Sequence, residues 1–412
     1  MFIFFVLLIL FLLLFASKGN TAYITLVLLI FMSFFLQFLV GRSFEYKSYK
    51  TIINACFICV NIFLIIKPWS YANILRVENV NPTFLVHFKK ILYKFLLLNL
   101  ILNAVILIVV LIYIPDIAAF KAAGAYVKLY DQIPYFANIF RYAYTTQNSG
   151  YLAIPIFFYH LSNFEKKEAL YAFLLSTSSL LSGFAFYSRA QIYTYTLIFI
   201  TFFFLVKKAI PGTIRVKVFK VITYTSICIV VLFLSITYIR FSAMDYYGDR
   251  IPQTSIVKNP IIYSLIDYAS QSYSNGLYQL ERYTADKSLG GEQFFRDIYQ
   301  ILNFFGIVNW DAKESKALID TAYDYDGGAF NGYTAPLVFN FGYILTFLIS
   351  FTYFFAVKIR LKNMSVISLK SMFSLILLLV IPAVSIFYAG YALLLFPLLL
   401  LGLCSFTFFR IA

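Results

Sequence analysis

The sequence predicts an all-α, polytopic integral membrane protein with about 11 transmembrane helices. Of its 412 residues, 62% are hydrophobic, 20% aromatic and only 12% charged. A soluble domain has roughly half apolar and about a quarter charged residues. Uncharged stretches of 16 to 24 residues recur from end to end, the length that a helix needs to cross a bilayer. The strands of a transmembrane β-barrel would alternate between apolar and polar residues instead.

Apolar runs bounded by charged or turn residues predict the helices in order. They lie near 1–16, 21–40, 51–66, 91–114, 149–163, 169–187, 190–206, 221–239, 336–357, 371–388 and 391–408. We expect the first run to be retained as a span, because no positive residue precedes it and Phe15-Ala16-Ser17 is a poor cleavage site. The predicted spans divide the whole chain into five segments: helices 1–4 (1–114), an external interfacial loop (115–148), helices 5–8 (149–239), a large periplasmic loop (240–335) and helices 9–11 (336–412).

The basic loops predict the orientation. Lys89-Lys90, Lys166-Lys167, the block 207–220 and the block 358–370 are separated by even numbers of spans, so they share one side. By the preference of Lys and Arg for cytoplasmic loops, that side is the cytoplasm. The same count places the 41–50 loop outside, together with the segments 115–148 and 240–335.

Acidic residues gather in the 240–335 segment. It holds 12 of the 18 Asp and Glu and eight Lys or Arg, a net charge of −4, which leaves +19 on the rest of the chain. The overall charge of +15 therefore reflects topology, and it does not indicate a nucleic-acid partner. The segment is rich in Tyr, Asn, Ser and Gly, with predicted turns at Asn275-Gly276 and Gly290-Gly291. Aromatic faces beside short polar side chains suit sugars.

Six of the eleven arginines fall on the predicted external side, against the positive-inside preference: Arg141, Arg189, Arg240, Arg250, Arg282 and Arg296. Arg189 occupies a tight turn between two nearly chargeless spans, and Arg240 lies where the eighth span ends. A guanidinium group suits a lipid-linked diphosphate, because its planar fork matches phosphate oxygens.

The spans lack mid-membrane Asp and Glu, which disfavours a proton- or ion-coupled transporter. The two histidines, His87 and His160, fall at or near the predicted cytoplasmic side, so no external histidine base is predicted.

This layout, with one large external loop before the last three spans, resembles the O-antigen polymerase family of oligosaccharide repeat-unit polymerases. Ser188-Arg189, followed by the 192–206 span and Lys207-Lys208, is similar to that family's short arginine turn. The run Phe330-Asn331-Gly332-Tyr333-Thr334-Ala335-Pro336, leading into Phe339-Asn340-Phe341-Gly342, resembles its loop-to-helix re-entry. Where the family often has an acidic residue before the Phe-Gly step, this chain has Asn340.

The resemblance implies a multi-span glycosyltransferase of the lipid-linked-donor type, similar to the GT-C architecture, in the bacterial inner membrane. It would transfer a growing glycan from undecaprenyl diphosphate to an incoming undecaprenyl-diphosphate-linked repeat unit, and the product would be O-antigen or a related surface polysaccharide. The implied partners are this lipid-linked oligosaccharide, as donor and acceptor, and the bilayer. A chain-length regulator stays open as a further partner, and no metal or cofactor is implied.

On this interpretation we assign roles to ten residues. Arg189 and Arg240 are expected to hold the donor diphosphate, with Arg282 as a third candidate, because positive charge is needed where negative charge develops. The candidate bases for the acceptor hydroxyl are Asp245, Asp249 and Glu281. The remaining substrate-binding candidates are Arg296, Asn331, Tyr333 and Thr334.

Three other readings stay open. An O-antigen ligase-like transferase is similar in fold but characteristically uses a histidine in its large loop. A repeat-unit flippase or other transporter would need a polar interior path and no large external loop. A membrane acyltransferase would also use a histidine base near the membrane.

Overall fold

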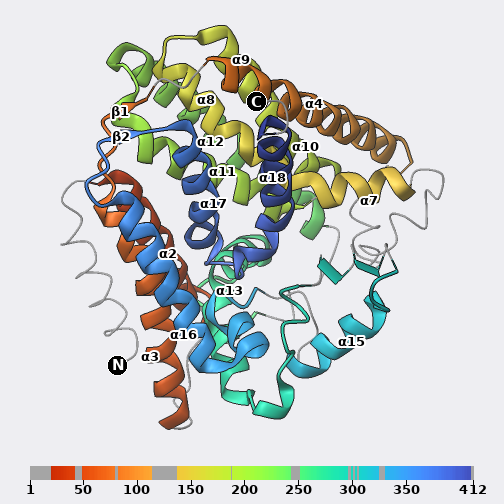
Figure 1. Cartoon of the computed structure of the whole chain (residues 1–412). Coiled ribbons are helices and arrows are strands. Elements are labelled where there is room, and N and C mark those ends of the chain that lie inside the picture. The colour runs from red at the N-terminus through yellow and green to blue at the C-terminus, as the bar shows by residue number, and fades with distance from the viewer. Residues whose placement is uncertain are drawn as a thin grey trace. The chain divides into compact units, whose positions relative to one another are not determined.

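The computed structural model describes residues 20–41, 49–78, 82–113, 137–186, 188–242, 251–295, 298–299, 302–303, 306–323 and 330–409 (Figure 1). The described part is mostly helical, and its two short strands, β1 (Arg76–Val77) and β2 (Val366–Ile367), pair in parallel. The predicted all-α class is therefore confirmed. The predicted first span at 1–16 lies outside the described residues.

The chain packs into two units, each drawn from segments far apart in the sequence. Unit 1 comprises Met1–Asn73, Arg250–Asn363 and Val380–Ala392, and unit 2 comprises Ile74–Asp249, Met364–Leu379 and Leu393–Ala412. The described helices of unit 1 are α2 (Thr21–Leu39), α3 (Tyr49–Ile66), η1 (Lys67–Tyr71), α13 (Pro260–Arg282), η7 (Ala285–Lys287), α15 (Ala312–Tyr323) and α16 (Thr334–Leu361).

Unit 2 holds α4 (Pro82–Tyr113), α7 (Ala137–Thr146), η4 (Gln147–Leu152), α8 (Ala153–Ser162), α9 (Lys166–Ser176), α10 (Ser178–Ala185), α11 (Arg189–Val206), η5 (Lys207–Ala209), α12 (Gly212–Ser242) and α18 (Leu395–Phe409). The helices α17 (Leu369–Val384) and η8 (Gly390–Leu394) contribute residues to both units.

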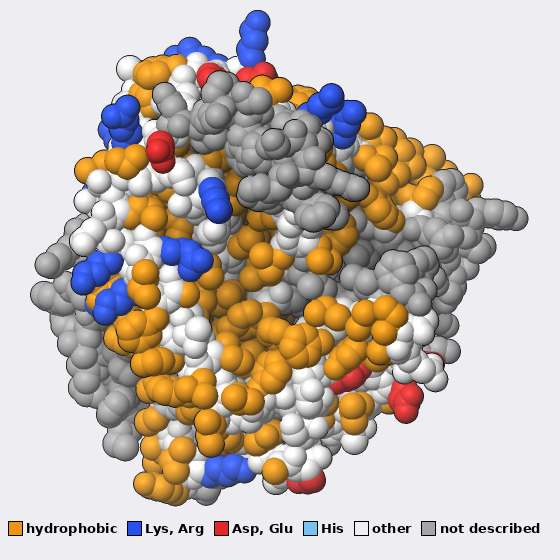
Figure 2. All heavy atoms as spheres, viewed as in Figure 1, with side chains coloured by type: hydrophobic (Ala, Val, Ile, Leu, Met, Phe, Trp, Pro, Cys, Tyr) orange, Lys and Arg blue, Asp and Glu red, His pale blue; other side chains and the backbone are white. Residues whose placement is uncertain are grey.

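Four helices of the described part are long and apolar enough to cross a membrane: Tyr49–Tyr71, Phe88–Tyr113, Ala190–Ala209 and Thr334–Leu361. Two shorter apolar helices, Thr21–Gln37 and Leu369–Val384, accompany them. Large apolar side chains are exposed along these helices, among them Ile108 and Ile112 on α4 and Ile344 and Ile359 on α16. Figure 2 shows hydrophobic side chains over much of the visible described surface, as expected of a chain whose outer faces contact lipid.

Helices occur at the predicted positions from 21–40 onward, with two internal breaks. The predicted span at 169–187 is divided at Thr177 into α9 and α10. Helix α16 contains non-helical backbone at Gly342, with φ 72° and ψ 174°. Such a conformation is essentially confined to glycine. The Thr334–Phe341 part of α16 is therefore a half-helix, separated by a break from the long apolar part that follows.

Helices α3 and α16 of unit 1 are joined by buried polar pairs. Tyr343 OH donates to Asn54 Oδ1 at 2.7 Å, and Ser350 Oγ donates to Asn61 Oδ1 at 2.6 Å. Polar side chains between apolar helices hold them together in a bilayer, where lipid offers no alternative partner. Because the numbering of both helices rises along this series of contacts, the helices run in the same direction. The predicted topology, in which both spans enter from outside, requires this direction.

Helix α13 was not predicted from the sequence. It begins at Pro260 behind an N-cap, Asn259, whose Oδ1 accepts the backbone N–H groups of Ile261 and Ile262 at 3.0 and 3.1 Å, and Pro suits the first helical position. The turn predicted at Asn275-Gly276 is wrong, because both residues lie inside this helix. Gly276 allows close approach instead, since a Cβ there would lie 2.7 Å from the Asn331 carbonyl oxygen.

Helix α13 and the 251–257 stretch contact helix α2 in unit 1. Helix α13 packs on α2 through the stacked rings of Phe34 and Tyr273, 4.2 Å apart, and through Gln37 Nε2, which donates to the Ser270 carbonyl at 2.7 Å. The carbonyl of Leu39 accepts the backbone N–H groups of Ile256 and Val257. The end of α2 and the 251–257 stretch therefore lie side by side.

Candidate functional site

The half-helix Thr334–Phe341 forms the centre of the candidate site in unit 1. The break at Gly342 frees carbonyl groups that a continuous helix would use, and the Phe339 carbonyl accepts the backbone N–H of Leu289 at 2.7 Å. Leu289, Ala322, Tyr323 and Phe339 form a small apolar core, with Tyr283 packed against it. The polar 283–295 stretch and α15 are thus fixed onto the broken helix.

Asn340 supplies the polar part of this attachment. Its Oδ1 accepts the backbone N–H groups of Gln293 and Phe294 at 3.1 and 3.3 Å, while its Nδ2 donates to the Pro336 carbonyl at 2.6 Å. Tyr323 OH donates to Gln293 Oε1 at 2.5 Å. Burial raises the pKa of Tyr323, against the smaller effects of its hydrogen bonds to Gln293 and Asn331, which lower it. The phenol is therefore neutral and serves as a donor.

The re-entry segment in front of the half-helix is buried. The backbone N–H groups of Asn331 and Gly332 donate to the Phe387 carbonyl at 3.1 and 3.0 Å. Tyr333 is 1% exposed, and its hydroxyl lies 2.7 Å from Tyr391 OH and 3.1 Å from Ser350 Oγ. This bonding gives Tyr333 a structural role.

Thr334 differs from Tyr333. It is 2% exposed, and its Oγ1 has no hydrogen-bond partner among the described residues. A buried hydroxyl without a partner is costly unless water or a ligand supplies one. Of the predicted substrate-binding residues, Thr334 therefore offers a hydroxyl that no internal contact explains.

Glu281 and Arg282 lie at the end of α13. Glu281 Oε1 accepts a hydrogen bond from Thr51 Oγ1, and Lys50 Nζ donates to the backbone carbonyls of Glu281 and Tyr283 at 2.6 and 3.2 Å. These contacts tie α13 to the start of α3 and give Glu281 a structural role. The Arg282 guanidinium carbon lies 3.7 Å from the centroid of the Tyr278 ring, a cation–π stack on the exposed surface.

The other predicted catalytic residues belong to unit 2 or lie outside the described residues. Arg189 is the first residue of α11, behind the N-cap Ser188, whose Oγ accepts the Gln191 backbone N–H at 3.4 Å. Arg240 lies in the last turn of α12. The structure describes the backbone of both arginines but not their side chains. Asp245, Asp249 and Arg296 lie outside the described residues.

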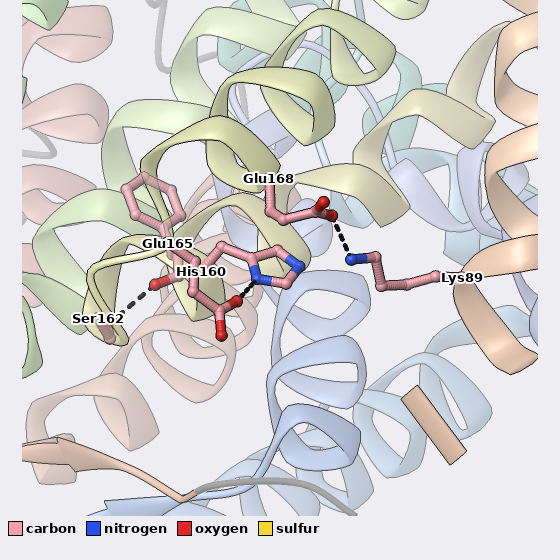
Figure 3. Close-up of polar contacts among 6 residues, drawn as sticks. Lys89, His160, Ser162, Glu165 and Glu168 are labelled. Carbon is pink, nitrogen blue, oxygen red and sulfur yellow. Dashed lines mark hydrogen bonds and ion pairs between the residues drawn. The ribbon is translucent and has the colours of Figure 1, made fainter. Parts of the chain in front are cut away.

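A second polar cluster lies in unit 2, on the predicted cytoplasmic side (Figure 3). His160 Nδ1 bonds with Glu165 Oε2, and Lys89 Nζ lies 2.5 Å from Glu168 Oε2. Strand β1 contacts β2, η5 and α8 in the same unit. These contacts bring together the loops that the sequence places on one side, and the ion pair joins α4 to α9.

Sequence reasoning missed the attachment of the 283–295 stretch to the half-helix. It noted Asn340 only as a departure from a family pattern and did not single out Gln293 or Tyr323. The polar face of α13 carries a signal, since Ser264, Asp267, Gln271, Asn275 and Gln279 recur three or four residues apart, as on one face of a helix. The described residues contain no group of three or more His, Cys, Asp or Glu that could hold a metal.

No family model, no curated protein and no solved structure matches this chain.

Proposed function

We propose that the chain is a metal-independent glycosyltransferase of the repeat-unit polymerase type, a multi-pass protein of the bacterial inner membrane with about 11 spans. In this proposal it joins undecaprenyl-diphosphate-linked oligosaccharides into O-antigen or a related surface polysaccharide on the periplasmic face. The bilayer and the lipid-linked oligosaccharide are its partners.

The break at Gly342 is the observation that carries the proposal. Non-helical backbone within a membrane helix is tolerated where protein buries it or where it lines a cavity. Here the break lies in the Phe339-Asn340-Phe341-Gly342 motif, and the polar 283–295 stretch is bonded to it through Asn340 and Phe339. A polar segment held against apolar helices suits an enzyme whose substrates have a lipid anchor and a sugar head.

The proposed reaction is displacement at an anomeric carbon. The acceptor hydroxyl oxygen forms a bond to the anomeric carbon of the donor glycan, the bond from that carbon to the diphosphate oxygen breaks, and undecaprenyl diphosphate leaves with the bonding electrons. A carboxylate takes the proton of the hydroxyl. Arg189 and Arg240, with Arg282 as the third candidate, stabilise the negative charge that develops on the diphosphate.

The contacts of Glu281 affect the choice of base. Because its Oε1 already accepts a hydrogen bond from Thr51, proton abstraction by Glu281 would compete with the anchoring of α13. Asp245 or Asp249 is therefore the better candidate for the base. The neutral Asn340 takes no part in proton transfer and fixes the 283–295 stretch.

Deletion of the gene tests the reaction class. A polymerase predicts that the polysaccharide ladder disappears on a gel while a single repeat stays attached to its anchor, and that the wild-type gene restores the ladder. Loss of every repeat would indicate the flippase or ligase-like alternatives. An unchanged ladder would refute a role in glycan assembly.

A further inference from the structure

Unit 2 contains an apolar cavity of about 310 Å³. Its walls come from α8, α9, α10, α11 and α12, and they include Phe157, Leu161, Ala169, Phe173, Phe199 and Val218. This volume is about twice that of an engineered apolar cavity of about 150 Å³ that stays dry and binds benzene. The cavity is therefore large enough for part of a hydrocarbon chain.

The hydroxyl groups in the cavity wall are already bonded within the protein. Thr196 Oγ1 donates to the Ile192 carbonyl at 2.9 Å, and Tyr195 OH lies 2.7 Å from Ser176 Oγ. No cavity-lining residue is among the described side chains with a buried polar atom that lacks a hydrogen-bond partner. A water molecule needs two to four polar partners, so the interior suits an apolar chain better than water.

Two lysines, Lys166 and Lys217, complete the lining. Lys166 begins α9, Lys217 lies in the second turn of α12, and both side chains are exposed. A lysine can lay its aliphatic stem along an apolar wall and keep its ammonium group at the aqueous edge. One end of the cavity therefore carries positive charge, at the level of the predicted cytoplasmic interface.

The neighbouring acidic side chains have partners other than these two lysines. Glu165 bonds to His160, and Glu168 pairs with Lys89. Neither Lys166 nor Lys217 forms an ion pair within the described residues. Lys207, Lys208, Arg215 and Lys220 add further positive charge in the same stretch of the sequence. The cytoplasmic leaflet supplies anionic lipids, and basic pockets between membrane helices bind their head groups.

We propose that this cavity binds an anionic glycerophospholipid of the cytoplasmic leaflet. One acyl chain enters the apolar cavity, and Lys166 and Lys217 bind the phosphate. This site is independent of the proposed glycosyl transfer. The bound lipid stabilises the folded state of unit 2.

The test uses the full chain purified in a non-ionic detergent. Dioleoylphosphatidylglycerol or dioleoylphosphatidylcholine is added, and Tm is followed by far-UV circular dichroism, because both tryptophans, Trp69 and Trp310, belong to unit 1. A ligand that binds only the folded state raises Tm in a saturable way. We expect this rise with phosphatidylglycerol and little with phosphatidylcholine.

Three variants locate the effect. Lys166→Gln/Lys217→Gln removes the charges that line the cavity, and Val218→Trp fills the cavity without changing charge. The matched control, Lys167→Gln/Lys208→Gln, removes two basic residues that do not line it. We expect both cavity variants to lose at least half of the phosphatidylglycerol effect and the control to keep it.

Four results would overturn the proposal: an equal rise in Tm with phosphatidylcholine, an effect kept in both cavity variants, an effect lost equally in the control, or a larger rise with undecaprenyl phosphate through the same residues. If the double lysine variant fails to fold, Val218→Trp still decides between the cavity and a general basic surface. Counting bound lipids by native mass spectrometry gives an independent measure of the same binding.

Discussion

Asn340 and Gln293 are joined twice, although 47 residues separate them in the sequence. Asn340 Oδ1 accepts the Gln293 backbone N–H at 3.1 Å, and Asn340 Nδ2 lies 3.3 Å from Gln293 Oε1. Through this pair the polar 283–295 stretch is attached beside the break in α16. An amide serves here better than a carboxylate, because it also donates to the Pro336 carbonyl.

Replacing Asn340 tests this attachment. Asn340→Ala leaves the backbone N–H groups of Gln293 and Phe294 without their acceptor, and a buried unsatisfied donor costs about 1–3 kcal/mol. We expect limited proteolysis between residues 283 and 330 to become faster. The control Asn303→Ala removes an acceptor of the exposed Trp310 backbone N–H and should change little. Equal protection of the wild type and the Asn340 variant would contradict the attachment.

Because of the break in α16, any side chain at Gly342 is expected to destabilise the fold. With φ 72° and ψ 174°, and with Tyr283 OH the nearest atom at 3.8 Å from an added Cβ, Gly342→Ala introduces backbone strain of about 1–3 kcal/mol with little steric clash. Gly402→Ala is the matched control, since a Cβ there meets nothing within 4 Å and alanine favours helix. Unfolding in mixed micelles should show destabilisation for Gly342→Ala alone. Equal stability of both variants would count against the break.

Substitutions at Tyr333 and Thr334 are expected to have opposite effects on stability and on polymer formation. Tyr333→Phe loses the bonds to Ser350 and Tyr391, so it should lower the free energy of unfolding by about 0.5–2 kcal/mol, the range of polar contacts between membrane helices, and leave polymer formation unchanged. Thr334→Val removes a buried hydroxyl with no described partner, so it should maintain or raise stability and reduce polymer formation if this hydroxyl binds substrate. Unfolding curves and polysaccharide gels of both variants check the pair. If Tyr333→Phe reduced polymer formation and Thr334→Val lowered stability instead, Tyr333 would be the substrate-binding residue and Thr334 the structural one.

The Lys89–Glu168 pair is expected to stabilise the fold at neutral pH and to lose this effect in acid. The hydrogen bond from Lys89 holds the pKa of Glu168 below its usual value, and partial burial opposes this shift. A carboxyl with a lowered pKa in the folded state stabilises the fold above its unfolded pKa, and this stabilisation disappears as the pH falls through the folded pKa. Glu168→Gln should therefore have a lower Tm than the wild type at pH 7, and the difference should vanish in acid. A constant difference across the pH range would refute the assignment.

The sequence predicted the apolar helices well, because a span leaves a long uncharged run, and α2, α3 and α11 begin and end within about two residues of the predicted bounds. It did not predict α13, because that helix has a polar face and contains Asn275-Gly276, a dipeptide typical of turns. Gly342 was singled out only as part of a motif, and the break there was not predicted, since φ is not readable from residue type.

The contacts of the candidate site could not be predicted for a different reason. The partners of Asn340 and Glu281 lie 47 and 230 residues away, and a sequence alone gives no such pairing. The charge and the aromatic content of the 240–335 segment led us to place candidate site residues there. They did not show that Tyr333 and Glu281 are bonded internally.

The measurement that tests the central claim most directly is the polysaccharide ladder of a deletion strain that carries Arg189→Ala, with Arg189→Lys and Arg215→Ala at matched protein levels in the membrane. If Arg189 binds the donor diphosphate, Arg189→Ala abolishes the ladder and leaves the single anchored repeat. Lysine should restore it only in part, because it lacks the planar fork, and Arg215→Ala should keep it whole. A full ladder from Arg189→Ala would contradict the account.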